Sequence, residues 1–195
     1  KIYRNDSGTF VDISAAVVGI KSGSVAWGDY DGDGDLDILE CGSPQGGGYA
    51  TKLYRNDIGT FVDVHTEIAR IAYGKGAWGD YDNDGDLDIL VSGTGYTGEP
   101  GAGVTPLSKV YRNDQGRFID IAPGMMDLGG SSVAWGDYDG DGDLDIVVSG
   151  FANSSRFAKI YRNEIATPNS VPTVPSALIA TVLGTQATLG WNKSS

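Results

Sequence analysis

The sequence is poor in several residue types, and each shortage excludes a class of protein. Cys41 is the only cysteine among the 195 residues, so no internal disulfide can form. Lysine and arginine total only 14 and form no cluster, which argues against DNA or RNA as a partner. No apolar run approaches the roughly 18 residues of a membrane-spanning helix, so no membrane insertion is expected. A single histidine, His65, provides neither a Ser-His-Asp set nor a second zinc ligand, and we expect no enzymatic activity.

The negative charge is concentrated in three short stretches, residues 29–37, 80–88 and 137–145. Of the 26 acidic residues, 15 lie in these stretches, and the formal net charge of the chain is −12. Five carboxylates within nine residues repel one another unless a cation lies among them. The spacing Asp-x-Asp-x-Asp-Gly-x-x-Asp brings alternate side chains toward one centre, and its glycine permits the sharp bend between them. We therefore expect three bound Ca²⁺ ions, at the following aspartates: Asp29, Asp31, Asp33, Asp35, Asp37, Asp80, Asp82, Asp84, Asp86, Asp88, Asp137, Asp139, Asp141, Asp143 and Asp145.

The acidic stretches belong to a longer internal repeat. The string Ala-Trp-Gly-Asp-Tyr-Asp begins at Ala26, Ala77 and Ala134. The string Lys-x-Tyr-Arg-Asn begins at Lys1, Lys52, Lys109 and Lys159. The distance from each of the first three lysines to the next repeat tryptophan is 26 residues, whereas the distance from that tryptophan to the next lysine is 25, 31 or 24 residues. All variation in length therefore falls in one segment per repeat, namely residues 42–51, 93–108 and 150–158.

Each repeat is typical of four short strands, because seven prolines against 30 glycines and few helix-forming runs favour strands and turns. In one repeat the predicted strands are residues 24–30, 36–41, 52–56 and 61–64, and residues 64–72 are predicted to form one helical turn. Four-stranded units of about 50 residues indicate an all-β fold of β-propeller-type blades, with the acidic loop between the first two strands. The acidic loops and the variable segments then lie at opposite ends of the strands.

About three blades are present, in units of about 1–13, 24–64, 76–121 and 132–163. A ring needs at least four blades, so we expect further blades or other copies to supply the remainder. After this first region, residues 1–165, the composition changes, and residues 166–195 form a second region. It begins with a proline-rich linker, and two strand-like runs follow, residues 177–183 and 186–191. The second region resembles the opening of a fibronectin type III domain, and we expect it to pack against another subunit as an added strand.

The acidic loops, preceded by Ala-Trp-Gly and followed by Leu-Asp-Ile, resemble the FG-GAP/VCBS repeat family of integrin α-like β-propellers. The resemblance covers roughly residues 1–164. It implies a propeller with Ca²⁺ in each acidic loop, where positions 1, 3, 5 and 9 bind by side chain and position 7 by its main-chain carbonyl. Position 7 is Asp35, Asp86 or Asp143. An EF-hand has the same opening but needs glutamate at position 12, and the three loops have Glu40, Val91 and Val148 there.

Three other recurring features carry predictions. The repeated tryptophans, Trp27, Trp78 and Trp135, are expected to pack between blades, with stacking on a ligand as the alternative. The repeated arginines, Arg4, Arg55, Arg112 and Arg162, are expected to make hydrogen bonds between blades. The glycosylation sequon occurs at Asn5, Asn153 and Asn192, and Asn153 is the best placed because an exposed loop is expected there.

These observations predict a non-catalytic calcium-binding repeat module of an extracellular or cell-surface protein. The ions would be structural, and the module would serve adhesion or protein assembly through a protein or glycan partner at the cell exterior. Two alternatives are a carbohydrate-binding, lectin-like propeller and a polymerising subunit of an extracellular filament that exchanges strands through its termini.

Overall fold

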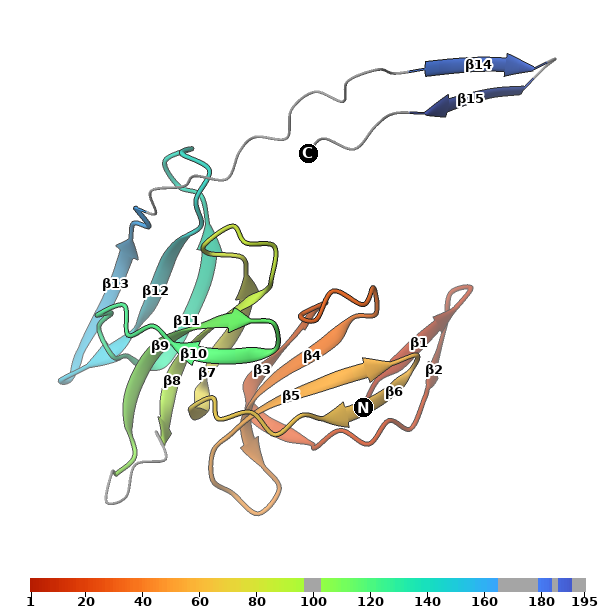
Figure 1. Cartoon of the computed structure of the whole chain (residues 1–195). Coiled ribbons are helices and arrows are strands. Elements are labelled where there is room, and N and C mark those ends of the chain that lie inside the picture. The colour runs from red at the N-terminus through yellow and green to blue at the C-terminus, as the bar shows by residue number, and fades with distance from the viewer. Residues whose placement is uncertain (97–102, 165–178, 184–185, 191–195) are drawn as a thin grey trace.

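The computed structural model describes residues 1–96, 103–164, 179–183 and 186–190, and every regular element within these ranges is a strand (Figure 1). This confirms the predicted all-β fold class. The described part of the chain has no helix of the length and apolarity needed to cross a membrane. The strands are β1 (Tyr3–Asp6), β2 (Thr9–Asp12), β3 (Ile20–Gly28), β4 (Asp37–Pro44), β5 (Ala50–Asp57), β6 (Thr60–Asp63), β7 (Arg70–Gly79), β8 (Asp88–Tyr96), β9 (Thr105–Asp114), β10 (Arg117–Asp120), β11 (Gly129–Gly136), β12 (Asp145–Ala152), β13 (Ser155–Tyr161), β14 (Ile179–Leu183) and β15 (Gln186–Gly190).

The strands form separate antiparallel sheets in chain order. Hairpin β1–β2 is followed by sheet 1 (β3–β6), sheet 2 (β7–β10) and sheet 3 (β11–β13), and β14 pairs with β15. Sheets 1 and 2 have four strands each, as expected for propeller-like blades, and none of the described sheets is closed. In each sheet the acidic loop precedes the second strand and the variable segment follows it. These two connections therefore lie at opposite ends of that strand.

The second strand of each four-stranded sheet is buried on both faces, as its apolar sequence predicts. Every residue of β4 from Asp37 to Ser43 is buried. The first strand starts earlier than predicted, at Ile20 rather than Ser24, because a bulge between Lys21 and Ser24 lets the pairing with β4 continue.

The helical turn predicted for residues 64–72 is wrong, since β7 begins at Arg70 and no helix occurs in the described ranges. Packing between the sheets holds this segment extended. Ile71 is buried in an apolar cluster with Leu39 and Cys41 of sheet 1. The Thr51 hydroxyl donates to the Ala69 carbonyl at 2.8 Å and accepts the Ile71 N–H at 3.3 Å. Tertiary contacts thus override the weak local preference for a helix.

Neighbouring sheets pack face to face through aliphatic side chains. Between sheets 1 and 2, Leu39 and Cys41 of β4 belong to the same buried cluster as Val91 of β8. Between sheets 2 and 3, Leu90 of β8 and Val148 of β12 belong to a second buried cluster. Residues from opposite faces of β8 therefore take part in the two junctions, which explains why this central strand contains little but apolar residues.

Each junction also contains a stacked pair of aromatic rings. Trp78 of sheet 2 stacks on Tyr30 from the acidic loop of sheet 1, with ring centroids 6.2 Å apart and planes 8° apart. Trp135 of sheet 3 stacks in the same way on Tyr81, at 6.4 Å and 16°. The predicted packing between blades is confirmed for these two tryptophans. It is wrong for Trp27, which is 53% exposed and whose ring contact, within the described residues, is with Phe61 of its own sheet.

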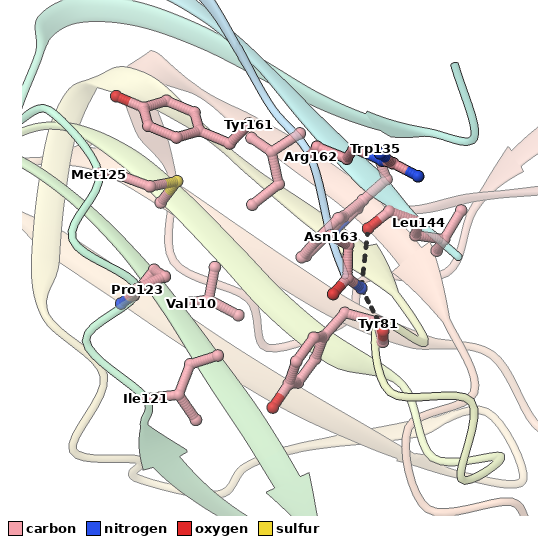
Figure 2. Close-up of a pocket in the computed structure, with 11 residues that line it drawn as sticks. Tyr81, Val110, Ile121, Pro123, Met125, Trp135, Leu144, Tyr161, Arg162 and Asn163 are labelled. Carbon is pink, nitrogen blue, oxygen red and sulfur yellow. Dashed lines mark hydrogen bonds between the residues drawn. The ribbon is translucent and has the colours of Figure 1, made fainter. Parts of the chain in front are cut away.

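The two junctions differ in one respect. At the first junction, the Phe118 ring of β10 completes an aromatic triad with Tyr30 and Trp78. Sheet 3 has no fourth strand among the described residues, and a cavity of about 190 Å³ lies beside Tyr81 and Trp135 at the second junction (Figure 2). The cavity lies beside the stacked pair, where the first junction has the Phe118 ring.

The glycine before the acidic loop allows the tryptophan ring to approach the backbone. A Cβ atom at Gly79 would lie 2.6 Å from Cδ1 of Trp135, whereas a Cβ at the equivalent Gly136 of sheet 3 would meet no atom within 4 Å. We expect Gly79→Ala to reduce the free energy of unfolding by about 1–3 kcal/mol, because the ring must move. Gly136→Ala is the matched control and should change it by less than about 0.5 kcal/mol. Urea unfolding measures both, and equal effects of the two substitutions would contradict the packing.

The proline-rich linker and the expected packing of the C-terminal tail lie outside the described residues, as does Asn192. Within the tail, β14 and β15 pair from Ile179 opposite Gly190 to Leu183 opposite Gln186, so the two predicted strand runs form one hairpin. The fibronectin type III resemblance stays a prediction. Both other predicted glycosylation sites are exposed: Asn5 lies in strand β1, just before the β1–β2 turn, and Asn153 lies in the turn between β12 and β13.

Candidate metal centres

The three acidic loops connect β3 to β4, β7 to β8 and β11 to β12, and each gathers carboxylates around one point. In each group, one oxygen from each of three carboxylates lies within 4.8 Å of the others. The groups are Asp29, Asp31 and Asp33; Asp80, Asp82 and Asp88; and Asp137, Asp139 and Asp145. Three of the four predicted side-chain ligands thus converge in each loop. The fourth, Asp37, Asp84 or Asp141, stands outside the group.

The first aspartate of each loop accepts hydrogen bonds from backbone N–H groups later in the same loop. Asp80 accepts backbone N–H groups from Asp84 and Gly85, each at 3.1 Å. Gly85 has a φ of +97°, a left-handed conformation that explains the glycine at position 6. The other two loops repeat the bond to this glycine, from Gly34 to Asp29 at 3.0 Å and from Gly142 to Asp137 at 3.1 Å.

The last aspartate of each loop accepts hydrogen bonds from two backbone N–H groups that are far apart in the sequence. The carboxylate of Asp88 is fully buried and accepts the N–H of Tyr81 and the N–H of Asn113, each at 2.8 Å. One bond holds the start of the loop and the other holds the third strand of the sheet. Asp37 and Asp145 make the same two bonds in their own repeats. A carboxylate oxygen has more than one lone pair, so these bonds leave room for a metal ion.

The electrostatics of the loops suit a cation. Burial raises the pKa of Asp88 to about 7. Burial, and then the charge of Asp84, raises the pKa of Asp82. One oxygen of Asp82 and one of Asp29 are buried without a hydrogen-bond partner among the described residues. Buried carboxylate oxygens need a compensating positive charge or donor, and a hard cation coordinated by oxygen would supply it.

The aspartate at position 7 of each loop makes side-chain hydrogen bonds outside the carboxylate group. A carboxylate oxygen of Asp35 accepts the N–H of Ile58 at 3.0 Å, and one of Asp86 accepts the N–H of Gln115 at 3.3 Å, so both hold the turn between the third and fourth strands. Asp143 instead accepts from the Asn83 side chain of the neighbouring loop at 2.9 Å. The side chains are thus engaged outside the carboxylate groups, which is compatible with the predicted main-chain role.

A family model described as an FG-GAP-like repeat matches residues 1–40 and 94–148. The match supports the FG-GAP/VCBS repeat family. The two matched segments contain the first and third acidic loops, together with the tryptophan that precedes each. No curated protein matches the chain.

The acidic loops are also held by an asparagine for which the sequence analysis predicts no role. Asn113, the last residue of Lys-x-Tyr-Arg-Asn, donates through Nδ2 to the carbonyls of Leu87 in its own sheet and Tyr30 in the preceding sheet, at 3.1 and 2.9 Å. Its Oδ1 accepts the N–H of Gly116 at 2.6 Å and shapes the following turn. Asn163 repeats the two donations to Leu144 and Tyr81. The recurrence of this asparagine in all four copies was the signal that could have identified it.

The predicted hydrogen bonds of the repeated arginines between blades are wrong. Arg55 Nε and Nη2 donate to Asp57 two residues along the same strand, at 2.8 and 2.9 Å. Arg4 pairs with Asp6 and Arg112 with Asp114 in the same manner. The carboxylate at i+2 lies on the same side of the strand, so the local pair forms without reaching another sheet.

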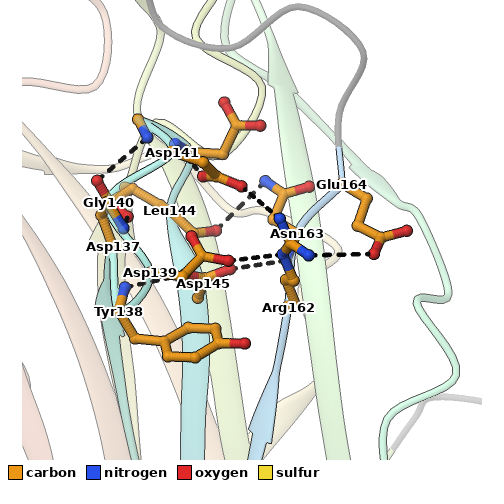
Figure 3. Close-up of polar contacts among 12 residues, drawn as sticks. Asp137, Tyr138, Asp139, Gly140, Asp141, Leu144, Asp145, Arg162, Asn163 and Glu164 are labelled. Atoms are coloured by element: carbon orange, nitrogen blue, oxygen red, sulfur yellow. Dashed lines mark hydrogen bonds and ion pairs between the residues drawn. The ribbon is translucent and has the colours of Figure 1, made fainter.

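The third acidic loop departs from this pattern, and here Glu164 replaces the aspartate that pairs with arginine in the other copies. The Arg162 side chain points toward the acidic loop. Its Nε lies 2.7 Å from a carboxylate oxygen of Asp139, and its Nη2 lies 3.1 Å from one of Asp141 (Figure 3). Its Nη1 is 3.7 Å from Glu164. A guanidinium therefore pairs with two predicted calcium ligands of this loop and would compete with a cation that binds there.

We expect Arg162→Gln to tighten calcium binding at the third loop by roughly three- to tenfold, since a competing exposed charge is removed. The matched control is Arg55→Gln, whose guanidinium is engaged by Asp57 and should affect its loop less. The amide resonances of Gly34, Gly85 and Gly142 report each loop separately in an NMR calcium titration. An unchanged affinity at Gly142 in Arg162→Gln would refute the competition.

Proposed function

We propose that this chain is a non-catalytic calcium-binding repeat module in which Ca²⁺ is structural. The observation that carries the proposal is that three loops with the same spacing each bring three carboxylates together. The unpartnered buried oxygens of Asp29 and Asp82 and the match to the FG-GAP-like repeat support it. Each ion would cancel the repulsion within its loop and hold the first two strands of a sheet to the third.

We further propose that the module belongs to an extracellular or cell-surface protein and serves adhesion or assembly. Extracellular calcium modules bind at about 10⁻⁴–10⁻³ M, which suits the cell exterior rather than the cytosol. The variable segments lie at the strand ends away from the acidic loops, so they can change with the partner, protein or glycan, without disturbing the ions.

Thermal unfolding in calcium and in a chelator tests the structural role. A melting temperature that rises with calcium, and rises much less with the same concentration of magnesium, supports it. Identical melting curves in calcium and in EDTA would refute the structural role.

A further inference from the structure

A side-chain hydrogen bond joins the second acidic loop directly to the third. Nδ2 of Asn83 donates to a carboxylate oxygen of Asp143 at 2.9 Å, across 60 residues of sequence. Asn83 is position 4 of its loop and directly follows Asp82, a member of the second carboxylate group. Asp143 is position 7 of the third loop, where the resemblance to the FG-GAP/VCBS repeat family implies a main-chain ligand. The bond therefore links a residue beside one candidate metal centre to a predicted ligand of the next.

The burial of Asp143 sets the third loop apart from the other two. Asp143 is only 2% exposed, whereas Asp35 and Asp86, at the same position of the first two loops, are partly exposed. Those two carboxylates accept a backbone N–H from a turn of their own sheet, whereas Asp143 accepts from the neighbouring loop. A buried carboxylate is stabilised by each donor that it keeps. The position of Asp143 therefore depends on the Asn83 amide.

The amide occurs in one loop because position 4 is glycine in the other two. Gly32 and Gly140 have φ of +72° and +78° at this position, and Asn83 has φ of +60°. All three residues thus adopt the left-handed conformation, which asparagine tolerates better than most residues. The backbone bends alike in the three loops, and the second loop alone has a side chain at this bend that can reach its neighbour.

Other contacts between neighbouring loops are shared by the two junctions. At each junction an asparagine of the third strand, Asn113 or Asn163, donates to one carbonyl in the preceding loop and one in its own loop (Figure 2 shows Asn163). The stacked rings of the two junctions are 6.2 and 6.4 Å apart. The first and second loops therefore serve as an internal reference, joined by these contacts but without an amide at position 4.

We propose that Asn83 is a positioning residue that couples the second and third acidic loops, so that calcium bound at the second loop raises the calcium affinity of the third. One oxygen of Asp82 is buried without a hydrogen-bond partner among the described residues, which leaves it available to an ion. Once Asp82 is held by an ion, the adjoining Asn83 amide is held with it and keeps Asp143 in place. The third loop then loses less conformational freedom when it binds its own ion.

The coupling is reciprocal, because linkage requires each site to change the affinity of the other by the same factor. The proposal rests on the proposed function, calcium binding by the acidic loops. It concerns most the loop whose own carboxylates are engaged by another cation. Arg162 pairs with Asp139 and Asp141, and Asp141 also accepts the N–H of Asp143 at 3.1 Å.

Direct electrostatics between the loops have the opposite sign. An ion at the second loop cancels negative charge that would attract an ion to the third, so this effect weakens the second binding event. Salt at about 0.15 M screens it beyond about 8 Å. A positive coupling therefore requires a structural contact such as the Asn83 bond, and removal of the amide should abolish the coupling or reverse its sign.

A double-mutant cycle tests the proposal. Asp82→Asn removes the charge of a predicted ligand and so weakens calcium binding at the second loop. Asn83→Gly removes the amide and installs the residue that the other two loops have at position 4. The wild type, both single variants and the double variant are titrated with calcium at about 0.15 M ionic strength. The NMR amide resonances of Gly34, Gly85 and Gly142 report the first, second and third loops.

We expect Asp82→Asn to weaken calcium binding at Gly142 by about three- to tenfold when Asn83 is present. In the Asn83→Gly background the same substitution should change that affinity by less than about twofold. Because Asp82→Asn removes one charge in both backgrounds, the difference between the two ratios isolates the Asn83 contact. The internal reference is Asp31→Asn in the first loop, which should change the affinity at Gly85 by less than about twofold.

The calcium affinity at Gly34 should be the same in the wild type and in the three variants of the cycle, which shows that each variant is folded. An equal effect of Asp82→Asn on Gly142 in the two backgrounds would overturn the coupling while leaving calcium binding intact. Resonances of all three glycines that do not respond to calcium in the wild type would overturn the proposed function and the coupling together.

Discussion

Removal of calcium is expected to lower the melting temperature of this chain by roughly 10–30 °C. A ligand that binds only the folded state stabilises it by RT ln(1 + [L]/Kd). For a Kd of about 10⁻⁴–10⁻³ M and about 10 mM calcium, three sites contribute roughly 4–8 kcal/mol together. A chain of this size shifts its melting temperature by about 2–4 °C per kcal/mol. The carboxylate groups at the three loops are the physical source of this effect.

Differential scanning calorimetry in about 10 mM calcium and in EDTA at matched ionic strength measures the shift. Magnesium at the same concentration is the control for general screening, because it resists dehydration and demands octahedral geometry. A shift equal in calcium and magnesium would mean that charge screening, rather than coordination in the loops, stabilises the chain.

Asp88→Asn is expected to be the most destabilising single substitution in the acidic loops. The amide cannot accept both backbone N–H groups as the carboxylate does, so one buried donor loses its partner and a predicted calcium ligand loses its charge. In calcium we expect the free energy of unfolding to fall by about 2–5 kcal/mol. In EDTA at pH 8 the loss should be smaller, because the substitution also removes a buried charge that no ion compensates.

The sign of the EDTA result follows from the pKa of Asp88, which burial raises from 3.8 to about 7. A raised carboxyl pKa makes the metal-free fold less stable as the pH rises through this range, and an asparagine does not titrate. Urea unfolding of both proteins, with and without calcium, measures the difference. Asp114→Asn, which removes only an exposed partner of Arg112, is the control and should have little effect in either condition. Equal losses for Asp88→Asn in calcium and in EDTA would contradict a metal role for Asp88.

The sequence was sufficient to predict the strands and the acidic loops because both depend on local patterns. The fixed distance from lysine to tryptophan placed each loop between two strands, and alternating aspartates marked where carboxylates would meet. The predictions that failed depended on neighbours. Trp27 has the same local sequence as Trp78, but only Trp78 has a preceding tyrosine against it.

The remaining features of the site could not be predicted because they join residues far apart in the chain. The bond from Asn113 to Tyr30 spans 83 residues and crosses from one sheet to the next. Arg162 lies 2.7 Å from Asp139 in the copy where Glu164 replaces the aspartate of the other copies. Local spacing carries no information on either contact, whereas the repetition of the asparagine did indicate that it had a function.

Equilibrium dialysis against about 10 mM calcium, followed by elemental analysis of the protein, tests the central claim most directly. Three occupied acidic loops predict three Ca²⁺ ions per chain, and binding should be lost at one loop in Asp88→Asn. A chain that binds no calcium above the dialysis background would contradict the claim that calcium holds these loops together.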